Sequence, residues 1–518
     1  MIQQEAGHES GVEPVRDADE LKATEAWILR IVNEMLGNLG LIPPSLADLE
    51  LLKLEARKIK DSAETDKTII VLRGPAGTGK TSLINNLVGY RLLATSWNGA
   101  CTTVATELHY TDKDEHTAII HYVSKVEWFE ELRAYCDEET DELEDVSFPN
   151  DSIAMTINKL STLYPGKGWQ RGNPKRWTPK TIMDMERGQT RLGSTEAIDA
   201  VSAERFREAL KKYNDPHFSR VWPFIKLIRI KTKSDILRYG AVLVDLPGTN
   251  DSNVARNSVA ASYGKIYDQT WVTINIKRAK TDSDIDEFLR RLQDEQVESD
   301  RGNIRFVITH CDDGMQNFDT AQMIRDVPAL AKNEEFQKSV DQLKQQYRQK
   351  RALERAKKAL NHIRTRPSGT STPTLQRNGG EEFSQVITQL DEVSESIEEN
   401  KRKLGTIFSQ ARSQDVAESL ESKFRRVTSL CTSRSRELGI HFVGNNDYRA
   451  LTCDDVDEVV NMSSCFGLVQ DTGVPELASL ILKTSQRKLR ARTAKRLEKL
   501  KNLCLDIELE KSPCWNTK

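Results

Sequence analysis

Apolar and polar positions alternate along this chain with two periods, and together they predict an α/β fold. Apolar runs rich in β-branched residues, such as KTIIVL at 67–72 and AVLVDL at 241–246, are typical of strands buried in a parallel sheet. The run SLINNLVG, which follows the first of them, has the spacing of a helix. Five strands are predicted in this way, within 67–72, 241–248, 271–282, 304–313 and 439–451.

Helices are predicted near both ends of the chain. Between residues 20 and 62 the spacing predicts two helices, separated by Pro43 and Pro44. Another helix is predicted from Pro475 to about Cys504. The apolar stripe of the first helix consists of Ala23, Trp27, Ile31, Met35 and Leu39.

Two long polar stretches with apolar residues at helical spacing, 333–363 and 383–430, predict a projecting antiparallel pair of helices. At ~1.5 Å per residue, the first helix is about 45 Å long. The segment between them, RPSGTSTPTLQRNGG, is of low complexity and predicts a disordered linker over 366–381. The hairpin either serves self-association or the docking of a protein partner, or is a passive decoration of the fold. The sequence leaves these interpretations open.

Composition limits the class of protein. With 518 residues, of which 38% are hydrophobic, the chain can bury a large core and should hold more than one structural unit. Its 75 basic and 78 acidic residues give a net charge of −3, so charge provides no reason to expect nucleic acid or a membrane surface as a partner. No apolar run approaches the ~18 residues of a transmembrane helix.

The cysteines and the N-terminus indicate the compartment. Eight cysteines are scattered without Cys-x-x-Cys spacing, which suggests neither a zinc site nor a disulfide framework. The first residues are acidic and polar, unlike a signal peptide. An intracellular protein of the nucleus or cytoplasm is therefore predicted.

The clearest chemical signal is GPAGTGKT, which matches G-x-x-x-x-G-K-[ST] between a predicted strand and a predicted helix. Glycines let backbone N–H groups turn toward a phosphate, and a helix N-terminus adds partial positive charge. Lys80 is expected to reach the β- and γ-phosphates, and the Thr81 hydroxyl suits a magnesium ion. The predicted nucleotide-binding residues of this loop are Gly74, Pro75, Ala76, Gly77, Thr78, Gly79, Lys80, Thr81 and Ser82.

A second element, DLPG, ends the strand predicted at 241–248. Open α/β sheets place ligands at the carboxyl ends of their strands, so Asp245 is predicted to hold the magnesium shell. The N–H of Gly248 is predicted to meet a γ-phosphate. A DxxG pattern also occurs at ordinary strand–turn junctions, but its position after a phosphate loop favours the functional interpretation.

A third element, THCD, closes the fourth predicted strand and includes Thr309, His310 and Asp312. It has the position of the guanine-reading pattern [NT]-K-x-D, whose aspartate accepts hydrogen bonds from the guanine N1–H and exocyclic amine. His310 stands where lysine is usual, and an imidazole can also stack on a base. The alternative is an ordinary aspartate at a strand end. Further along, Gly444 and Asn445 are predicted to present backbone and amide groups to the base.

Taken together, GPAGTGKTSLINNLVG, CTTVATEL, VLVDLPGTNDSN, IKRAKTDSD, VITHCDDG, FVGNNDY and DTGVPEL resemble the motifs of the dynamin superfamily of large GTPases. Within it, the chain is similar to the nuclear GTPase SLIP-GC-like group, especially its fungal members. The resemblance covers roughly Leu21 to Arg490. It implies a P-loop GTPase domain with a mostly parallel sheet, flanking helices and a long helical-hairpin insertion. It also implies GTP as substrate and Mg²⁺ as cofactor.

The resemblance assigns roles to single residues. In such proteins a switch threonine closes over the γ-phosphate and magnesium, and both Thr102 and Thr103 match it. The choice between them stays open, as does the alternative of a threonine-rich strand edge. Lys80, the switch threonine and Gly248 would act in catalysis by positioning and electrostatic stabilisation. The implied metal ligands are Thr81, Thr102 and Asp245.

The chain departs from dynamin in the phosphate loop itself. Dynamin carries a catalytic glutamine followed by a serine where this chain has Ala76 and Gly77, so no side chain of this loop orients the attacking water. Arg73 is the nearest candidate for an arginine finger, and a solvated surface arginine is the commoner case. The prediction is slow GTP hydrolysis, stimulated by homodimerisation through the GTPase domain. Two other functions stay open: a nucleotide-dependent interaction module with little hydrolysis, and an ATPase of another phosphate-loop family.

The remaining segments carry weaker signals. The aromatic and basic run YPGKGWQRGNPKRW lies in the insertion at 112–219 and has either the composition of a single-strand nucleic-acid contact or that of a surface loop. Dynamin-like remodelers also need a stalk and a membrane-binding module, so membrane scission by this chain alone is not expected. The predicted organisation is a disordered N-terminus at 1–19, helices at 20–62, GTPase core at 63–320, helical insertion at 321–438, the end of the core at 439–485, and a basic C-terminal helix at 486–518 that could begin a truncated stalk.

Overall fold

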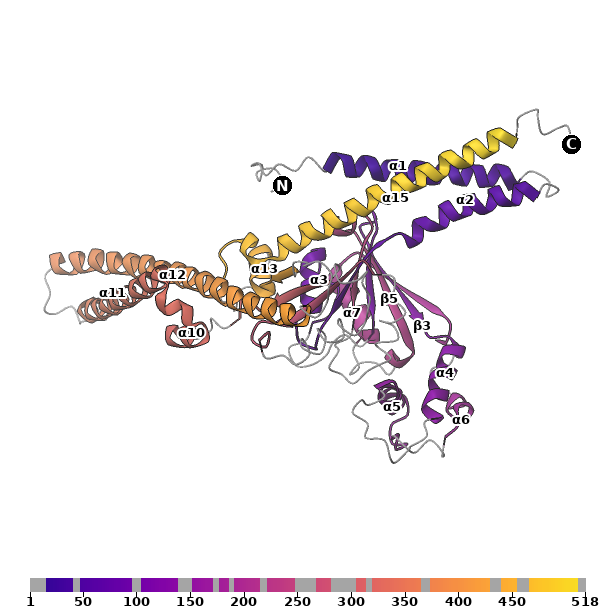
Figure 1. The fold of residues 1–518 in the computed structure, drawn as a ribbon. Helices are drawn as coiled ribbons and strands as arrows, with labels where there is room; N and C mark the ends of the chain where they lie inside the picture. Colours follow the sequence, from indigo (N-terminus) through magenta and orange to yellow (C-terminus); the bar gives the residue numbers. More distant parts are fainter. Residues whose placement is uncertain are drawn as a thin grey trace. The chain divides into compact units, whose positions relative to one another are not determined.

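The chain forms two compact units, which are described separately. The first comprises residues 1–270 and 477–518, and the second comprises residues 271–476 (Figure 1). The boundary at 270/271 therefore falls inside the core predicted at 63–320. The structure, a computed structural model, describes residues 15–40, 47–95, 104–137, 151–170, 177–185, 191–214, 221–246, 267–280, 304–313, 319–364, 373–428, 439–453 and 465–510.

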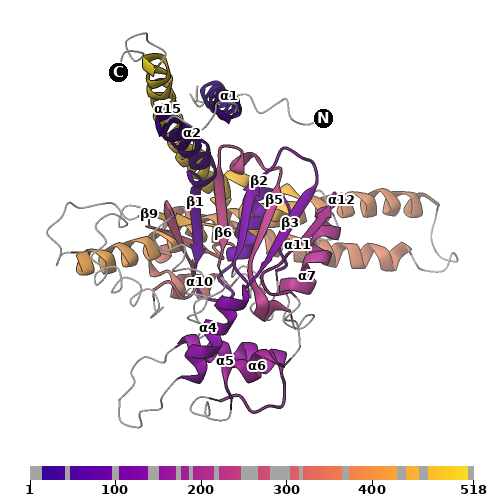
Figure 2. The same cartoon turned by 90° about the vertical axis from the view of Figure 1, so that its right-hand side faces the viewer.

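The first unit is built on six strands in the order β4-β3-β5-β2-β6-β1 (Figure 2). The pairs β1–β6 and β2–β5 are parallel, while β2–β6, β3–β4 and β3–β5 are antiparallel. Every residue of β6 is buried, as the apolar run at 241–246 predicts. The strands are β1 (Thr68–Arg73), β2 (Thr106–Tyr110), β3 (His116–Tyr122), β4 (Thr195–Ala200), β5 (Ile225–Thr232) and β6 (Ala241–Asp245).

Helices and short 3₁₀ turns flank these strands. A small group, α4 to α6, packs around the buried rings of Trp128 and Tyr135. Trp169 is also buried and lies 5.0 Å, centroid to centroid, from Trp177, so the ring of Trp169 contributes to packing in this group. This placement favours the structural interpretation of the aromatic run over a nucleic-acid contact. The elements are α3 (Lys80–Val88), α4 (Lys125–Cys136), α5 (Asp151–Leu163), α6 (Pro179–Met183), α7 (Ala203–Asn214), η3 (Trp222–Phe224) and η4 (Asp235–Leu237).

Three long helices of the first unit lie side by side: α1 (Val15–Gly40), α2 (Ala47–Thr65) and α15 (Val474–Glu510) (Figure 1). Apolar side chains from all three form one cluster. Ion pairs also join α1 to α15: the Glu25 carboxylate of α1 accepts hydrogen bonds from Arg492 at 2.9 Å and from Arg496, both of α15. The clustered residues are Ile28, Val32, Leu39, Leu52, Ala56, Ile59, Leu500 and Leu503.

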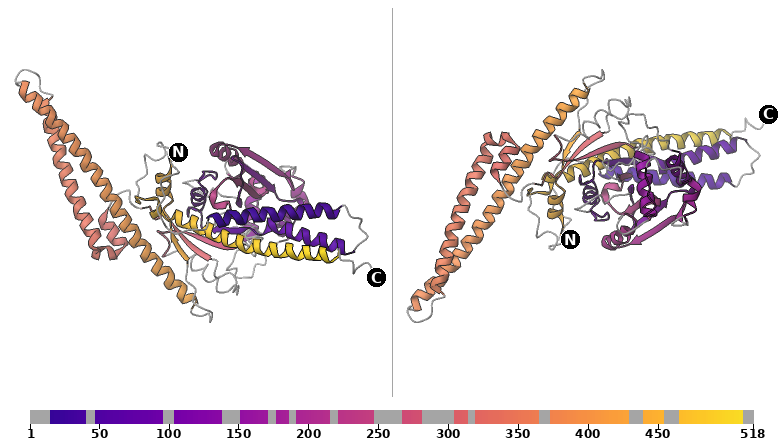
Figure 3. Two further views of the ribbon diagram at one scale, coloured as in Figure 1. Left: turned by 90° about the horizontal axis from the view of Figure 1, so that it is seen from above. Right: turned by 90° about the horizontal axis from the view of Figure 1, so that it is seen from below.

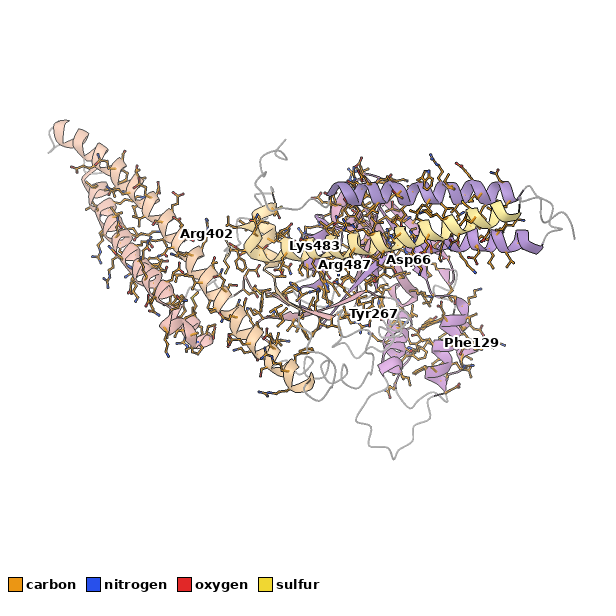
Figure 4. All side chains as sticks on the ribbon, turned by 45° about the horizontal axis from the view of Figure 1, so that its top comes forward. Asp66, Phe129, Tyr267, Arg402, Lys483 and Arg487 are labelled. Atoms are coloured by element: carbon orange, nitrogen blue, oxygen red, sulfur yellow. The ribbon has the colours of Figure 1, made fainter. Side chains whose placement is uncertain are left out.

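The helix α15 also holds the start of β1. Lys488 donates to the backbone carbonyl of Lys67 at 2.6 Å and pairs with Asp268 at 2.8 Å. Asp268 in turn accepts the N–H of Ile69 at 2.8 Å. Arg496 pairs with Asp66, just before the strand, at 3.3 Å (Figure 4). The strand that leads into the phosphate loop is thus anchored at its amino end.

The second unit contains the strands β7 (Gln269–Asn275), β8 (Ile304–Thr309) and β9 (Gly439–Phe442) in that order, with β9 parallel to β8. Its core includes Phe306, Phe336 and Phe408. The helical and 3₁₀ elements are α10 (Thr320–Asp326), η5 (Pro328–Lys332), α11 (Glu334–Arg364), α12 (Pro373–Thr428), α13 (Asn445–Thr452) and η6 (Val469–Thr472).

The predicted helical hairpin is present: α11 and α12 pack against each other along a long contact (Figure 3). Polar side chains lie inside this contact. Asn400 of α12 donates to the Ser339 carbonyl at 3.0 Å and to Gln346 Oε1 at 3.1 Å. Gln346 of α11 donates back to the carbonyl and the hydroxyl of Ser396, at 3.1 and 2.6 Å. The contact therefore has a hydrogen-bonded polar layer in its interior.

Replacing Asn400 with alanine is expected to destabilise the protein by ~1–3 kcal/mol, because buried acceptors on α11 lose their donor. Urea unfolding followed by far-UV circular dichroism measures the change. A matched control is Lys403→Ala, which removes an exposed cross-helix pair with Glu335 at 3.1 Å and should cost less than ~1 kcal/mol. Equal shifts for the two variants would contradict the role given to the buried layer.

Several predicted boundaries were wrong. The helix α1 begins at Val15, inside the stretch predicted as disordered at 1–19, and α12 begins at Pro373, inside the linker predicted at 366–381. The last predicted strand, 439–451, ends at Phe442 and gives way to α13, because Gly444 and the polar residues after it begin a helix. The helix predicted from Pro475 to about Cys504 is present as α15 (Val474–Glu510), and it runs without a break across the domain boundary predicted between 485 and 486.

The insertion predicted at 112–219 contains two strands of the sheet, β3 and β4, which sequence reasoning missed along with β2 and β5. In β4 the pattern TEAIDA is acidic and none of its residues is fully buried, so it lacks the apolar signal of a core strand. The α/β fold with a mixed, mostly parallel sheet, flanking helices and a long helical insertion is confirmed. Within the described ranges no helix is both long and apolar enough to cross a membrane.

Candidate functional site

The loop between β1 and α3 carries the strongest chemical signal of the first unit. Gly77 and Gly79 have φ angles of 76° and 79°, in the left-handed region that side-chain-bearing residues rarely adopt. A Cβ on Gly77 would meet no atom within 4 Å, so the backbone conformation, not crowding, requires glycine there. The loop ends at the N-terminus of α3, as the pattern GPAGTGKT predicts.

Lys80, the first residue of α3, folds back over this loop. Its Nζ donates to the carbonyls of Gly74 and Pro75 at 2.8 and 2.9 Å, and the residue is only 6% exposed. Thr78 also donates its hydroxyl to the Pro75 carbonyl, at 2.9 Å. The ammonium charge is therefore held inside the loop by short hydrogen bonds. Pro75, Ala76, Gly77, Gly79 and Ser82 complete the predicted phosphate-binding set around it.

Thr81 and Asp245 come together from the helix and from the end of β6. The Thr81 hydroxyl donates to Asp245 Oδ2 at 2.9 Å, and Asp245 is fully buried. Their proximity follows from the register, since Leu72 of β1 pairs with Asp245 of β6. A hydroxyl and a carboxylate oxygen are the hard ligands that Mg²⁺ prefers, so this pair fits the predicted magnesium shell. Elsewhere in the described part of the chain, no group of three His, Cys, Asp or Glu residues is placed to hold a metal.

Three predicted residues lie outside the described residues: the switch candidates Thr102 and Thr103, and Gly248 of DLPG. Arg73, the suggested arginine finger, is described. Its guanidinium lies over the ring of Tyr267, 5.4 Å from the centroid (Figure 4). A ring contact of this kind occupies the guanidinium at the end of β1.

In the second unit, Asp312 follows β8 and is 7% exposed. One carboxylate oxygen, Oδ2, accepts the backbone N–H groups of Asn446 at 2.7 Å and Asp447 at 2.9 Å, in the first turn of α13. The other, Oδ1, is buried and has no hydrogen-bond partner among the described residues. Burial raises the pKa of Asp312, while the two N–H groups favour its charged form. The carboxylate is thus oriented through one oxygen and leaves an acceptor at the other.

The residues predicted beside Asp312 lie around it. Gly444 precedes α13, and a Cβ there would stand 2.7 Å from the Phe466 ring and 3.2 Å from Asp312 Cβ, so only glycine fits the approach. Asn445 is buried in the first turn of α13. His310 has a φ of 59° and its Nδ1 lies 3.1 Å from the Thr309 hydroxyl, which donates to the Ile274 carbonyl. This left-handed turn after β8 presents Asp312 to α13.

Sequence reasoning missed Asp447, which is 1% exposed. Its Oδ2 accepts the N–H groups of Cys465 at 2.5 Å and Phe466 at 2.7 Å, and so joins the loop before η6 to α13. Burial raises the pKa of Asp447 to about 7, with the nearby Asp312 carboxylate adding to the rise. The run GNND is typical of a helix start and could have indicated this cap.

Asp447 should make stability depend on pH near neutrality. Its folded-state pKa of about 7 lies above the unfolded value, so folding takes up a proton between these values and stability falls as pH rises. Asp447→Asn retains an acceptor oxygen and cannot titrate. When the pH is lowered from 8 to 5.5, the free energy of unfolding of the wild-type protein is expected to rise by about 1–2 kcal/mol relative to that of Asp447→Asn. Urea unfolding of both proteins at both pH values measures this difference. A constant difference would contradict a titrating Asp447.

Comparisons with known proteins agree with these features. Residues 70–311 match the model of the Dynamin family. Nuclear GTPase SLIP-GC of Homo sapiens is 30% identical over 230 residues, which are 41% of this chain and 28% of that protein. Nuclear GTPase SLIP-GC of Mus musculus is 28% identical over 235 residues, with the same two coverages. The chain thus spans 28% of the length of each of these relatives.

Solved structures of an oligomerised bacterial dynamin pair, described as sensing and tethering membranes over long range, are also similar. One of them has a TM-score of 0.42 at 16% sequence identity, and the match covers 98% of this chain and 49% of the bacterial chain. Another has a TM-score of 0.40 at 17% identity, over 97% of this chain and 58% of its own.

Proposed function

This chain belongs to the dynamin superfamily, and we propose that it binds GTP with magnesium and hydrolyses it slowly to GDP and phosphate. Asp312 carries the choice of guanine. Its Oδ2 is fixed by two backbone N–H groups and its Oδ1 is a buried acceptor without a described partner, which suits a base that offers two adjacent N–H donors. Adenine offers no such pair.

The phosphate loop and the Thr81–Asp245 pair would promote hydrolysis by electrostatic stabilisation of the phosphate charge. Lys80 holds one positive charge within the loop, where the β- and γ-phosphates of a bound nucleotide would compete with the Gly74 and Pro75 carbonyls for its donors. Thr81 and Asp245 would hold magnesium, which when bound supplies charge neutralisation at the phosphate oxygens. The chain's own part is to position the phosphates and stabilise charge as the terminal P–O bond breaks. Water attacks the γ-phosphorus and its proton passes to the released phosphate.

Slow turnover is proposed because the loop lacks a side chain to orient the attacking water. Ala76 and Gly77 are exposed and carry no polar side-chain group, while Arg73 lies against Tyr267. A second protomer bound through the GTPase domain could supply the missing group, so dimerisation is proposed to stimulate hydrolysis. The same two residues favour one alternative, a nucleotide-dependent interaction module with little hydrolysis. The curated relatives are named nuclear, which makes the nucleus the first compartment to test.

Phosphate release from GTP and from ATP, with magnesium and over a wide range of protein concentrations, tests the proposal. GTP-selective release whose rate per molecule rises with concentration would support a dimer-stimulated GTPase. Tight GTP binding without release would favour the interaction module. Selective ATP turnover would overturn the role of Asp312, and release that is independent of magnesium would overturn the role of Thr81 and Asp245.

A further inference from the structure

The inserted helix α12 contacts the base-reading loop of the second unit directly. The hydroxyl of Ser409 donates to the Cys311 carbonyl at 3.0 Å, and Arg412 Nη2 donates to the same carbonyl at 2.9 Å. The same Nη2 donates to the Asp313 carbonyl at 3.2 Å. These two carbonyls belong to the residues on either side of Asp312. The carbonyls of both sequence neighbours of Asp312 are therefore held by one turn of the insertion.

A third residue on the same side of α12, Thr406, contacts the loop before η6, which also shapes Asp312. Thr406 donates its hydroxyl to the Cys465 carbonyl at 3.1 Å. The N–H of Cys465 donates to Asp447, and the N–H of Asp447 donates to Asp312. The spacing 406, 409, 412 repeats every three residues, so the three side chains follow one side of the helix over two turns. The helix thus supports Asp312 from both sides, directly and through Asp447.

Arg412 itself is well fixed. Its guanidinium lies 4.8 Å from the centroid of the Phe408 ring, one turn earlier on α12. Among the described residues no carboxylate lies within ion-pair distance of it, so its polar contacts are the two carbonyls. The nearby carboxylates pair with lysines instead. Asp415 of α12 pairs with Lys280, which follows β7, and Asp313 pairs with Lys277 at 3.2 Å. Because the partly buried guanidinium donates to two carbonyls of this loop, we infer that Arg412 holds the loop in place and does not serve as one half of a surface ion pair.

We propose that Ser409 and Arg412 are positioning residues for Asp312, so that the inserted hairpin sets the affinity for guanine. The inference rests on the proposed function. The clamp lies 36 residues after the start of α12 (409 minus 373), about 54 Å along a helix, so the hairpin extends far from the base-reading loop. A partner that shifts the hairpin would therefore act on guanine binding through these carbonyl contacts.

The test uses the full chain and the variant Arg412→Met, which keeps an apolar stem on Phe408 and loses the donors. Affinities for GTP, inosine triphosphate and ATP are measured by displacement of a fluorescent GTP analogue. The GTP affinity is expected to fall about 10-fold, which corresponds to ~1.4 kcal/mol. The preference for GTP over inosine triphosphate, which lacks the exocyclic amine, should shrink, and Arg412→Lys should recover part of it. In an Asp312→Ala background, Arg412→Met should change the GTP affinity little, because both act through one carboxylate.

A second measurement needs no nucleotide. Amide hydrogen exchange at 311–313 and 445–447 should accelerate in Arg412→Met and in Ser409→Ala. It should not accelerate in the control Arg402→Met, which changes an exposed arginine ten residues earlier on the same helix (Figure 4). Unchanged exchange together with an unchanged GTP preference in Arg412→Met would overturn the positioning role alone. A wild-type protein that does not prefer GTP to ATP would instead overturn the proposed function.

Discussion

A Lys80→Ala variant is expected to release phosphate from GTP at least ~100-fold more slowly than the wild-type protein, because one charge aimed at the transferring phosphoryl group is lost. The ammonium is buried in the loop, where it already donates to the Gly74 and Pro75 carbonyls. Water replaces this charge poorly in such a site, so binding of GTP should weaken as well. Single-turnover phosphate release and titration with a fluorescent GTP analogue measure the two effects.

Lys113→Ala is the matched control, since Lys113 is 70% exposed and pairs only at the surface with Glu115. It should leave both quantities within about twofold of the wild-type values. An unaltered rate in Lys80→Ala would exclude the loop from catalysis. Loss of folding is a separate outcome, recognised by circular dichroism before any rate is measured.

An Asp312→Asn variant is expected to lose affinity for GTP by ~10²–10⁴-fold, because a site built to hydrogen-bond a group rejects a mismatched one strongly. The amide keeps one acceptor for the N–H groups of Asn446 and Asp447 and places an NH₂ donor where guanine also presents donors. Xanthine has a carbonyl in place of the exocyclic amine. Xanthosine triphosphate should therefore bind the variant better than GTP does, which competition against a fluorescent nucleotide measures.

The neighbouring Asp313→Asn serves as the control for this substitution. Asp313 is a partly exposed carboxylate that pairs with Lys277 at 3.2 Å and has no assigned role toward the base. Its variant should keep the preference for GTP. If Asp312→Asn still preferred GTP to xanthosine triphosphate, guanine recognition would have to lie elsewhere in the chain.

The local parts of the fold and of the site were predictable from the sequence because their signals are local. The β1 strand, the glycine turns of the phosphate loop and the start of α3 follow one another within 68–88, and each has its own composition. The meeting of Thr81 with Asp245 could also be expected, since both stand at the ends of elements that a parallel sheet brings together. The long helices α11 and α12 show helical spacing over many turns.

Contacts that join distant segments were not predictable from one sequence. Nothing in the residues around Arg412 indicates that its guanidinium donates to carbonyls about a hundred positions earlier. Asp447 was overlooked for a different reason: its run GNNDY was interpreted as the end of a strand, although Asn and Asp at such a position favour a helix start. The strand β4 was missed because none of its residues is fully buried and its run TEAIDA has no apolar pattern. The strand β3 was missed because polar residues are interspersed in it, including His116, which is buried.

The polar layer inside the hairpin limits how α12 can move. Asn400, Gln346 and Ser396 satisfy one another at only one alignment of α11 and α12, and sliding by one helical turn, ~5.4 Å, would bury several of these groups unpaired. A force applied to the hairpin is therefore transmitted as the tilt or rotation of a two-helix rod, and not as the slippage of one helix along the other. Ser409 and Arg412 lie on the same helix, only nine and twelve residues beyond Asn400, so they would move together with the hairpin.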